Sequence, residues 1–187
     1  MAVRQRVSEQ TYQEIALGDD DRIWELHDGQ LVEKPGMGAE HNDVLTELVV
    51  SLHNQLDRRE YRVRSNSARL RYSPANVFVP DVVVVPAALE RALRGRPRSL
   101  ETYPEPLPLV VETWSPSTGR YDVRTKLEHY QRRGDLEIWR IHPYERTLTA
   151  WRRQPDGTYA ETVHRGGIIR PEFLPNVAID FDALFED

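Results

Sequence analysis

The amino-acid sequence predicts an α/β (α+β) fold in which helices flank a central mixed β-sheet. Two apolar runs, Val82–Val85 and Leu109–Trp114, are typical of strands that are covered on both faces. The second run leads through a helical segment into another apolar strand. Residues 109–141 therefore form a strand–helix–strand unit whose two strands should be parallel and joined by a right-handed crossover. A β-hairpin near each end of the chain completes the prediction.

The N-terminal part of the chain predicts a helix, a hairpin and a longer helix. Ser8 is a suitable N-cap for a short helix through Tyr12–Leu17, and Arg22–Lys34 has the pattern of a hairpin around the turn Asp28-Gly29. A second helix is expected at His41–Asp57, because apolar residues recur there at helical spacing and form one buried face. These apolar residues are Val44, Leu45, Leu48, Val49, Leu52 and Leu56.

The middle of the chain is rich in strand-forming residues. Tyr61–Ser65 and Ala68–Tyr72 predict two strands of an edge hairpin. Ala87–Arg94 has room for one or two helical turns, and the Arg/Pro-rich segment that follows, up to Pro108, is expected to be a surface loop.

The crossover helix is expected at Gly119–Arg133, ahead of a strand at Glu137–Ile141. The segment Ser115–Thr118 is suited to capping the start of this helix, and Gly134 is suited to a left-handed conformation at its end.

The C-terminal hairpin pairs Thr147–Arg152 with Thr158–Thr162 around the turn Pro155–Gly157. The chain has 187 residues and shows no internal repeat and no Gly/Ser linker, so we expect a single domain over residues 1–187.

Composition excludes several classes of protein. With 39% hydrophobic and 29% charged residues and a mean hydropathy of −0.63, the chain is expected to be globular, and it has no run near the ~20 apolar residues of a membrane span. It contains no cysteine, which excludes disulfides, thiolate zinc sites and cysteine nucleophiles. The start lacks the apolar core of a signal peptide, and we expect a cytoplasmic location and no membrane partner. No Gly-rich phosphate loop, HExxH or G-x-S-x-G motif supports a kinase, zincin or α/β-hydrolase.

The charged residues are unusual in type. A net charge of −5 argues against coating of nucleic acid without regard to sequence, although an enzyme that meets nucleic acid at one local patch remains compatible with it. Lys34 and Lys126 are the only lysines among 25 basic residues, and all the others are arginines. Because ammonium and guanidinium groups do different work, these two lysines are candidates for specific roles.

Two carboxylates occupy positions where burial is expected. Asp81 opens the Val82–Val85 strand, and Glu112 lies within the Leu109–Trp114 strand. A buried carboxylate is costly unless it is paired, hydrogen-bonded or bound to a metal. If the two strands are neighbours, both carboxylates meet at one sheet edge and offer a site for Mg²⁺. For Asp81 alone, capping of local backbone amides is an equally good interpretation.

Lys126 falls in the middle of the crossover helix, four residues after Asp122 and four before Tyr130. The simplest interpretation is a surface ion pair with Asp122, worth about 0.3–0.5 kcal/mol. The bias toward arginine argues against it, and Lys126 lies at the border of the inward-facing stripe of its helix.

These residues resemble a known pattern. Asp81 after Pro80, Glu112, Lys126 and Tyr130 occur in an order and spacing similar to those of the PD-(D/E)XK (restriction-endonuclease-like) nuclease superfamily, and in particular the bacterial Uma-type family of restriction-endonuclease-like proteins. The segments that carry the resemblance are WELHDGQLVEKPGMGAEH, LVVETWSPST, DVRTKLEHYQRRG and LEIWRIHP, and it covers roughly residues 10–185.

The resemblance implies a restriction-endonuclease-like fold, with Glu33 and His41 at characteristic family positions. Glu33 then becomes a candidate third acid and His41 a supporting residue. Without the resemblance, Glu33 would be a solvent-facing strand residue and His41 a helix cap. One departure is clear: the superfamily lysine would fall at Trp114, so Lys126 is implied as its substitute.

Arginine pairs mark the predicted edge hairpin. Arg62 and Arg64 are spaced by two and so share one strand face. We favour a solvated face, and phosphate contact by Arg62 and Arg64 is the alternative.

The resemblance implies a Mg²⁺-dependent (or Mn²⁺-dependent) endonuclease acting on DNA. Asp81, Glu112 and the main-chain carbonyl of Thr113 would hold the metal, Lys126 would orient the attacking water, and Glu33 would complete or support the shell. A catalytically silent nucleic-acid-binding or assembly module with the same fold is the alternative. RNA or a small phosphodiester as substrate is a third hypothesis. By analogy with the superfamily, a homodimer that pairs through the C-terminal hairpin is also an expectation.

Overall fold

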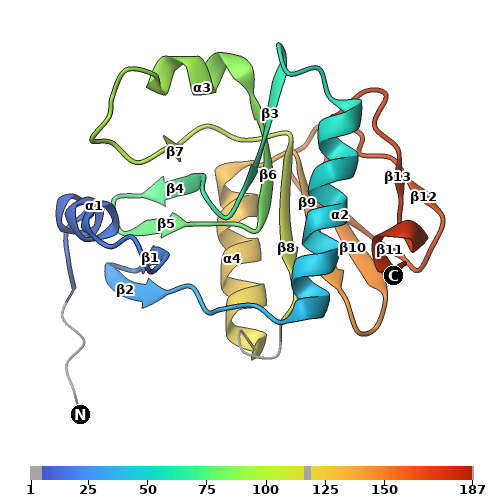
Figure 1. Cartoon of the computed structure of the whole chain (residues 1–187), viewed down its shortest axis with the longest axis horizontal. Helices are drawn as coiled ribbons and strands as arrows, with labels where there is room; N and C mark the ends of the chain where they lie inside the picture. The colour runs from blue at the N-terminus through green and yellow to red at the C-terminus, as the bar shows by residue number, and fades with distance from the viewer. Residues whose placement is uncertain (1–5, 116–118, 187) are drawn as a thin grey trace.

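A six-stranded mixed sheet forms the centre of the molecule (Figure 1). The computed structural model describes residues 6–115 and 119–186, without the side chains of 119–123. In spatial order the strands of the central sheet are β11 (Tyr159–His164), β10 (Thr147–Arg153), β9 (Glu137–His142), β8 (Leu109–Thr113), β6 (Val82–Pro86) and β3 (Tyr61–Ser65). Strands β8 and β9 are parallel and every other neighbouring pair in this sheet is antiparallel, which confirms the predicted strand–helix–strand unit and the C-terminal hairpin.

A second, five-stranded sheet is built mainly from the N-terminal part of the chain. Its strands in spatial order are β2 (Gln30–Glu33), β1 (Trp24–His27), β5 (Asn76–Phe78), β4 (Arg69–Ser73) and β7 (Thr102–Tyr103). The predicted hairpin β1–β2 is confirmed, and its turn residues Asp28 and Gly29 both have positive φ, at 48° and 78°. Strand β7 lies inside the segment that was expected to be only a loop.

The predicted edge hairpin of residues 61–72 is wrong. Strand β3 pairs with β6 in the central sheet, whereas β4 pairs with β5 and β7 in the second sheet. The two strands bury their apolar residues in different cores: Val63 packs against α2 (Ala39–Gln55), and Leu70 packs with Phe78 on the other side of the central sheet. Asn66, with φ of 49°, lies where the chain leaves β3.

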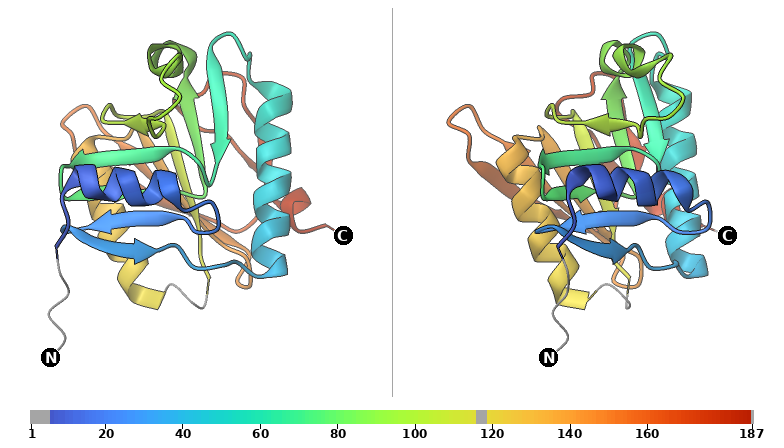
Figure 2. Two further views of the ribbon diagram at one scale, coloured as in Figure 1. Left: turned by 60° about the vertical axis from the view of Figure 1, so that its left-hand side comes forward. Right: turned by 90° about the vertical axis from the view of Figure 1, so that its left-hand side faces the viewer.

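Each face of the central sheet has its own cover (Figure 2). Val82 and Val84 face α2, while Val83 and Val85 face the side where the second sheet and α4 (Gly119–Arg133) pack. Burial on both faces explains why β6 consists almost entirely of valine. Alternation along the strands therefore decides which side chains of β6, β8 and β9 point toward α4.

The remaining elements are short. They are α1 (Glu9–Gly18), α3 (Ala87–Leu93), the pair β12 (Ile168–Ile169) and β13 (Ile179–Asp180), and the 3₁₀ helix η1 (Asp182–Phe185). Helix α1 has the predicted cap, in which the Ser8 hydroxyl accepts from the Thr11 amide at 3.1 Å. Gly134, with φ of +84°, ends α4 as predicted, while the predicted cap at its start lies mostly on residues 116–118, outside the described residues. None of the described helices is long and apolar enough to cross a membrane.

Candidate active site

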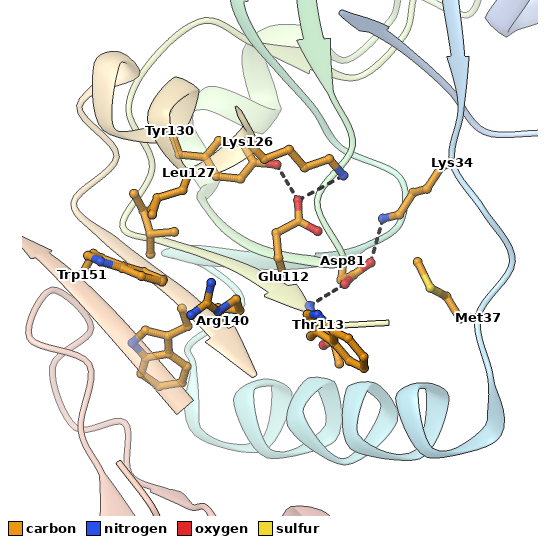
Figure 3. A pocket seen from close by; sticks show the side chains of 13 residues that line it. Lys34, Met37, Asp81, Glu112, Thr113, Lys126, Leu127, Tyr130, Arg140 and Trp151 are labelled. Atoms are coloured by element: carbon orange, nitrogen blue, oxygen red, sulfur yellow. Dashed lines mark hydrogen bonds and ion pairs between the residues drawn. The ribbon is translucent and has the colours of Figure 1, made fainter. Parts of the chain in front are cut away.

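A pocket lies where β6 begins and β8 ends, beneath α4 and beside the second sheet (Figure 3). Its charged lining residues are Lys34, Asp81, Glu112, Lys126 and Arg140. Aromatic, aliphatic and neutral polar residues line the rest, namely Met37, Thr113, Trp114, Leu127, Tyr130, Ile138, Trp139 and Trp151. The pocket therefore combines a charged end with an aromatic wall.

The strand register brings the two predicted carboxylates together. Val82 of β6 pairs with Val111 of antiparallel β8, so the next position on each strand places Asp81 beside Glu112. Glu112 in turn is in register with Arg140 of β9. The sequence predicted that Asp81 and Glu112 would meet if their strands were neighbours, and the topology meets that condition.

Asp81 is completely buried and is held by three donors. Its Oδ1 lies 2.8 Å from the Lys34 ammonium, and its Oδ2 accepts a 2.6 Å hydrogen bond from the Thr113 amide and lies 3.2 Å from His41 Nε2. Burial alone would raise the pKa of Asp81, but the charge of Lys34 and the hydrogen bond from His41 hold it below its usual value. Asp81 is thus an ionised anchor.

Glu112 is in a different electrostatic state. Its Oε1 accepts a 2.6 Å hydrogen bond from the Tyr130 hydroxyl and lies 3.4 Å from Lys126 Nζ, and its side chain is 21% exposed. Burial and the negative charge of Asp81 outweigh Lys126 and raise the pKa of Glu112 to about 7. At neutral pH this carboxyl is divided between its protonated and ionised forms, so a cation placed beside it would displace a proton.

Lys126 is buried, so its interpretation as a surface residue is wrong; the side chain of Asp122 lies outside the described residues. Its ammonium lies 3.0 Å from Glu25 Oε1, as well as near Glu112. The middle of α4 packs over the pocket, and this packing turns Lys126 and Tyr130 toward the carboxylates.

Glu25 is a site residue that the sequence did not single out. It lies on β1, is 1% exposed, accepts a 2.8 Å hydrogen bond from the Val79 amide and lies 3.0 Å from His27 Nε2. Burial would raise the pKa of Glu25, but the charge of Lys126 and the hydrogen bond from His27 lower it to about 2. A polar residue that alternates with Trp24 and Leu26 on a hairpin is typical of a solvent-facing strand side, so the pattern gave no signal of burial.

Lys34 is the second residue whose role the sequence left undefined. Its ammonium donates to Asn66 Oδ1 at 2.6 Å and to the Val79 carbonyl at 2.7 Å, besides its ion pair with Asp81. Both lysines of the chain therefore lie in this one pocket, each beside one of the two predicted carboxylates. In the sequence, the rarity of lysine among so many arginines was the feature that could have pointed to Lys34 as a site residue.

Glu33 and His41 separate in the structure. His41 lies in the first turn of α2, is buried and contacts Asp81. Glu33 is exposed on β2 and is not among the residues that line the pocket. Successive side chains of an extended segment point to opposite sides, so the burial of Lys34 turns Glu33 outward.

Arg62 and Arg64 also lie away from the pocket lining. On β3, Arg64 Nε lies 2.8 Å from Glu101 Oε1, and Arg62 Nε lies 3.8 Å from Glu90 Oε2. The two arginines are 20% and 25% exposed and face carboxylates of the α3–β7 region. Their charges are thus largely engaged within the chain.

Asp81 and Glu112 are the residues of the pocket that could bind a metal ion. Within the described parts of the chain, no group of three or more His, Asp or Glu side chains is placed to enclose a metal ion. Asp81 and Glu112 supply hard oxygen donors. Burial, together with the charge of Asp81, raises the pKa of Glu112, and a bound cation would offset this penalty on its ionised form. This donor set fits Mg²⁺, which is usually held by one or two carboxylates and keeps several waters.

The raised pKa of Glu112 leads to a prediction on stability. Its folded pKa of about 7 exceeds its unfolded value of 4.5, so the folded protein retains a proton that the unfolded chain loses, and stability falls as pH rises through this window. Glu112→Gln removes the titration, so we expect it to melt above the wild type at pH 8 in EDTA and close to it at pH 4.5. Thermal melts at both values test this, with Glu128→Gln at an exposed position of α4 as the control. The same difference at both pH values would contradict the assignment.

Comparisons with known proteins identify the family and the fold of the chain. The family model of Uma2, described as putative restriction endonuclease, matches residues 9–182. A crystal structure of a putative nuclease belonging to DUF820 from Anabaena variabilis ATCC 29413 superposes with a TM-score of 0.75 at 18% identity, covering 96% of this chain and 97% of that one, and supports the fold. No curated protein matches significantly. The chain thus has a restriction-endonuclease-like fold and belongs to the Uma2 family of putative restriction endonucleases.

Proposed function

We propose that this protein is a Mg²⁺-dependent endonuclease that hydrolyses phosphodiester bonds of DNA. The observation that carries the proposal is the pair of neighbouring carboxylates, Asp81 and Glu112, each with a buried lysine beside it. Family membership supports nuclease function in general. The metal and the DNA substrate are our inference from the chemistry of the pocket.

Asp81 and Glu112, with the main-chain carbonyl of Thr113, would hold Mg²⁺ or Mn²⁺. When bound, such an ion lowers the pKa of a water molecule and neutralises charge on the phosphate. Lys34, His41 and the Thr113 amide fix the orientation of Asp81, so this ligand is already in place in the folded chain. The Tyr130 hydroxyl fixes one oxygen of Glu112 in the same way.

Lys126 supplies the positive charge that the reaction requires. Its ammonium has three donors, and Glu25 and Glu112 hold it at the charged end of the pocket. Placed there, it can orient the attacking water and stabilise negative charge as it develops on the phosphate. Glu25 is a positioning residue in this scheme, because it acts on the substrate only through Lys126.

Metal binding gives the first test of the proposal. A ligand that binds only the folded state stabilises it, and at 100 times its Kd the gain of about 2.7 kcal/mol raises the Tm of a chain of this size by roughly 5–10 °C. We expect such a rise with Mg²⁺ or Mn²⁺, together with nicking of plasmid DNA that EDTA abolishes. The matched control is Asp81→Asn, which should show neither response.

The alternative, a catalytically silent module, rests on one observation. Trp114 occupies the position of the superfamily lysine, two residues after Glu112. A silent module would show no metal-dependent rise in Tm and no nicking, yet it would retain its affinity for DNA in EDTA. That combination of results would overturn the enzymatic proposal.

A further inference from the structure

Arg140 is a charged residue of the pocket that the proposed chemistry does not use. Its half-buried guanidinium lies over the Trp151 ring, 5.2 Å from the centroid. Among the described residues, no carboxylate lies within 4.0 Å of it. Burial lowers the pKa of Arg140, and the charges of Glu161 and Glu145 oppose this only from a greater distance. In Figure 3 the Arg140 side chain points into the space between Trp151 and Glu112, where an anion would neutralise it.

An aromatic stack continues the same sheet face. The Trp114 and His142 rings are stacked with centroids 4.2 Å apart and planes 16° apart, and Tyr144 meets Trp114 edge-on at 6.0 Å. Trp114 borders the pocket, and the Tyr144 side chain is 54% exposed. Trp114 itself is partly exposed, so part of its ring is accessible to a planar ligand at the edge of the pocket.

The register of β8 and β9 places these groups in two neighbouring cross-strand pairs. Glu112 is opposite Arg140, and two positions further along the same strands Trp114 is beside His142, because the Trp114 amide donates to the Ile141 carbonyl at 2.7 Å. Residues two apart share a face and are separated by about 6.6 Å along a strand. A phosphate at Arg140 and its own base at Trp114 would match this arrangement.

We propose that Arg140 and the Trp114–His142 stack form a subsite for one unpaired nucleotide, and that the preferred substrate is single-stranded DNA or a frayed strand end. This inference rests on the proposed function, because it places the nucleotide beside the carboxylates that would cleave it. Within a duplex, away from its ends, both faces of each base are covered by neighbouring base pairs, so an aromatic side chain there can stack only on a base that has left the helix. Recognition by one guanidinium and one stack also suits a chain of net charge −5, which repels an extended polyanion.

The test is fluorescence anisotropy with labelled oligonucleotides of one sequence in EDTA, as single-stranded DNA, blunt duplex DNA and single-stranded RNA. We expect single-stranded DNA to bind at least tenfold more tightly than the duplex. Trp114→Ala should weaken that binding roughly 5- to 150-fold, the loss typical of one base–aromatic stack. Arg140→Gln should weaken it and reduce the slope of log affinity against log salt by about 0.7.

Matched controls and a conservative variant keep the test decisive. Tyr72→Ala removes another partly exposed ring that contacts a histidine, His129, and Arg94→Gln removes an exposed arginine, and neither should change affinity. Trp114→Phe should keep most of the affinity that Trp114→Ala loses, which separates the loss of a stacking contact from misfolding.

Equal affinity for duplex and single strand, unaffected by Trp114→Ala, would overturn the subsite, and tighter binding of RNA would overturn its assignment to DNA. Metal-dependent cleavage of duplex DNA without any single-strand preference would remove the subsite and leave the proposed function intact. Single-strand binding through Trp114 without metal-dependent cleavage would overturn the proposed function and leave the subsite in place.

Discussion

Asp81→Asn should abolish metal-dependent cleavage and also destabilise the folded protein more than any other single change in the pocket. The neutral amide is a poor ligand for Mg²⁺, so the rise in Tm with metal should disappear. It also leaves the buried Lys34 ammonium without its anion, and breaking a buried ion pair typically costs about 3–5 kcal/mol. For a chain of this size that corresponds to a Tm lower by roughly 6–20 °C in EDTA.

A double-mutant cycle separates the two effects of this change. Lys34→Met added to Asp81→Asn removes the orphaned charge, so part of the lost stability should return while metal binding and cleavage stay absent. Calorimetry and plasmid nicking on the four proteins measure both quantities. If Asp81→Asn kept the metal-dependent rise in Tm, Asp81 would be a structural anchor and the metal site would have to lie elsewhere.

Lys126 should tolerate neither arginine nor alanine. Its side chain is 5% exposed and its ammonium is held between Glu25 and Glu112, so the longer planar guanidinium of Lys126→Arg would keep the charge but misplace the donors. Lys126→Ala removes the donors altogether. We expect each change to reduce the rate of DNA cleavage by a factor of about 10² or more, the usual loss for one preorganised donor.

Metal binding separates this role from that of the carboxylates. Both Lys126 variants should still show a rise in Tm with Mg²⁺, because Asp81 and Glu112 remain. Arg132→Lys, a change at an exposed position on the same helix, is the matched control and should leave the rate unchanged. Full metal-dependent cleavage by Lys126→Arg would remove Lys126 from the reaction and leave Lys34 as the remaining lysine of the pocket.

Much of the fold could be predicted from local patterns in the sequence. The N-terminal hairpin follows from its Asp28-Gly29 turn, α2 from its helical apolar stripe, and the parallel pair β8–β9 from the connection through α4. The hairpin predicted for residues 61–72 was wrong because proximity in sequence favours pairing, whereas the burial of Val63 and Leu70 in two separate cores sent the strands to two sheets.

The candidate site divides in the same way. The sequence by itself determined that two carboxylates in apolar strands, Asp81 and Glu112, would be costly to bury, because local hydrophobicity carries that information. It also singled out the two lysines, Lys34 and Lys126, in a chain whose other basic residues are arginines. Only the tertiary structure decided that Glu25 pairs with Lys126 of the pocket and that Glu33 lies outside it. Alternation in a hairpin fixes which residues share a face, but the burial of that face depends on whether another layer packs against it. Here α4 and the central sheet supply that layer, and they bury Glu25 of β1 against Lys126 and the Val79 amide.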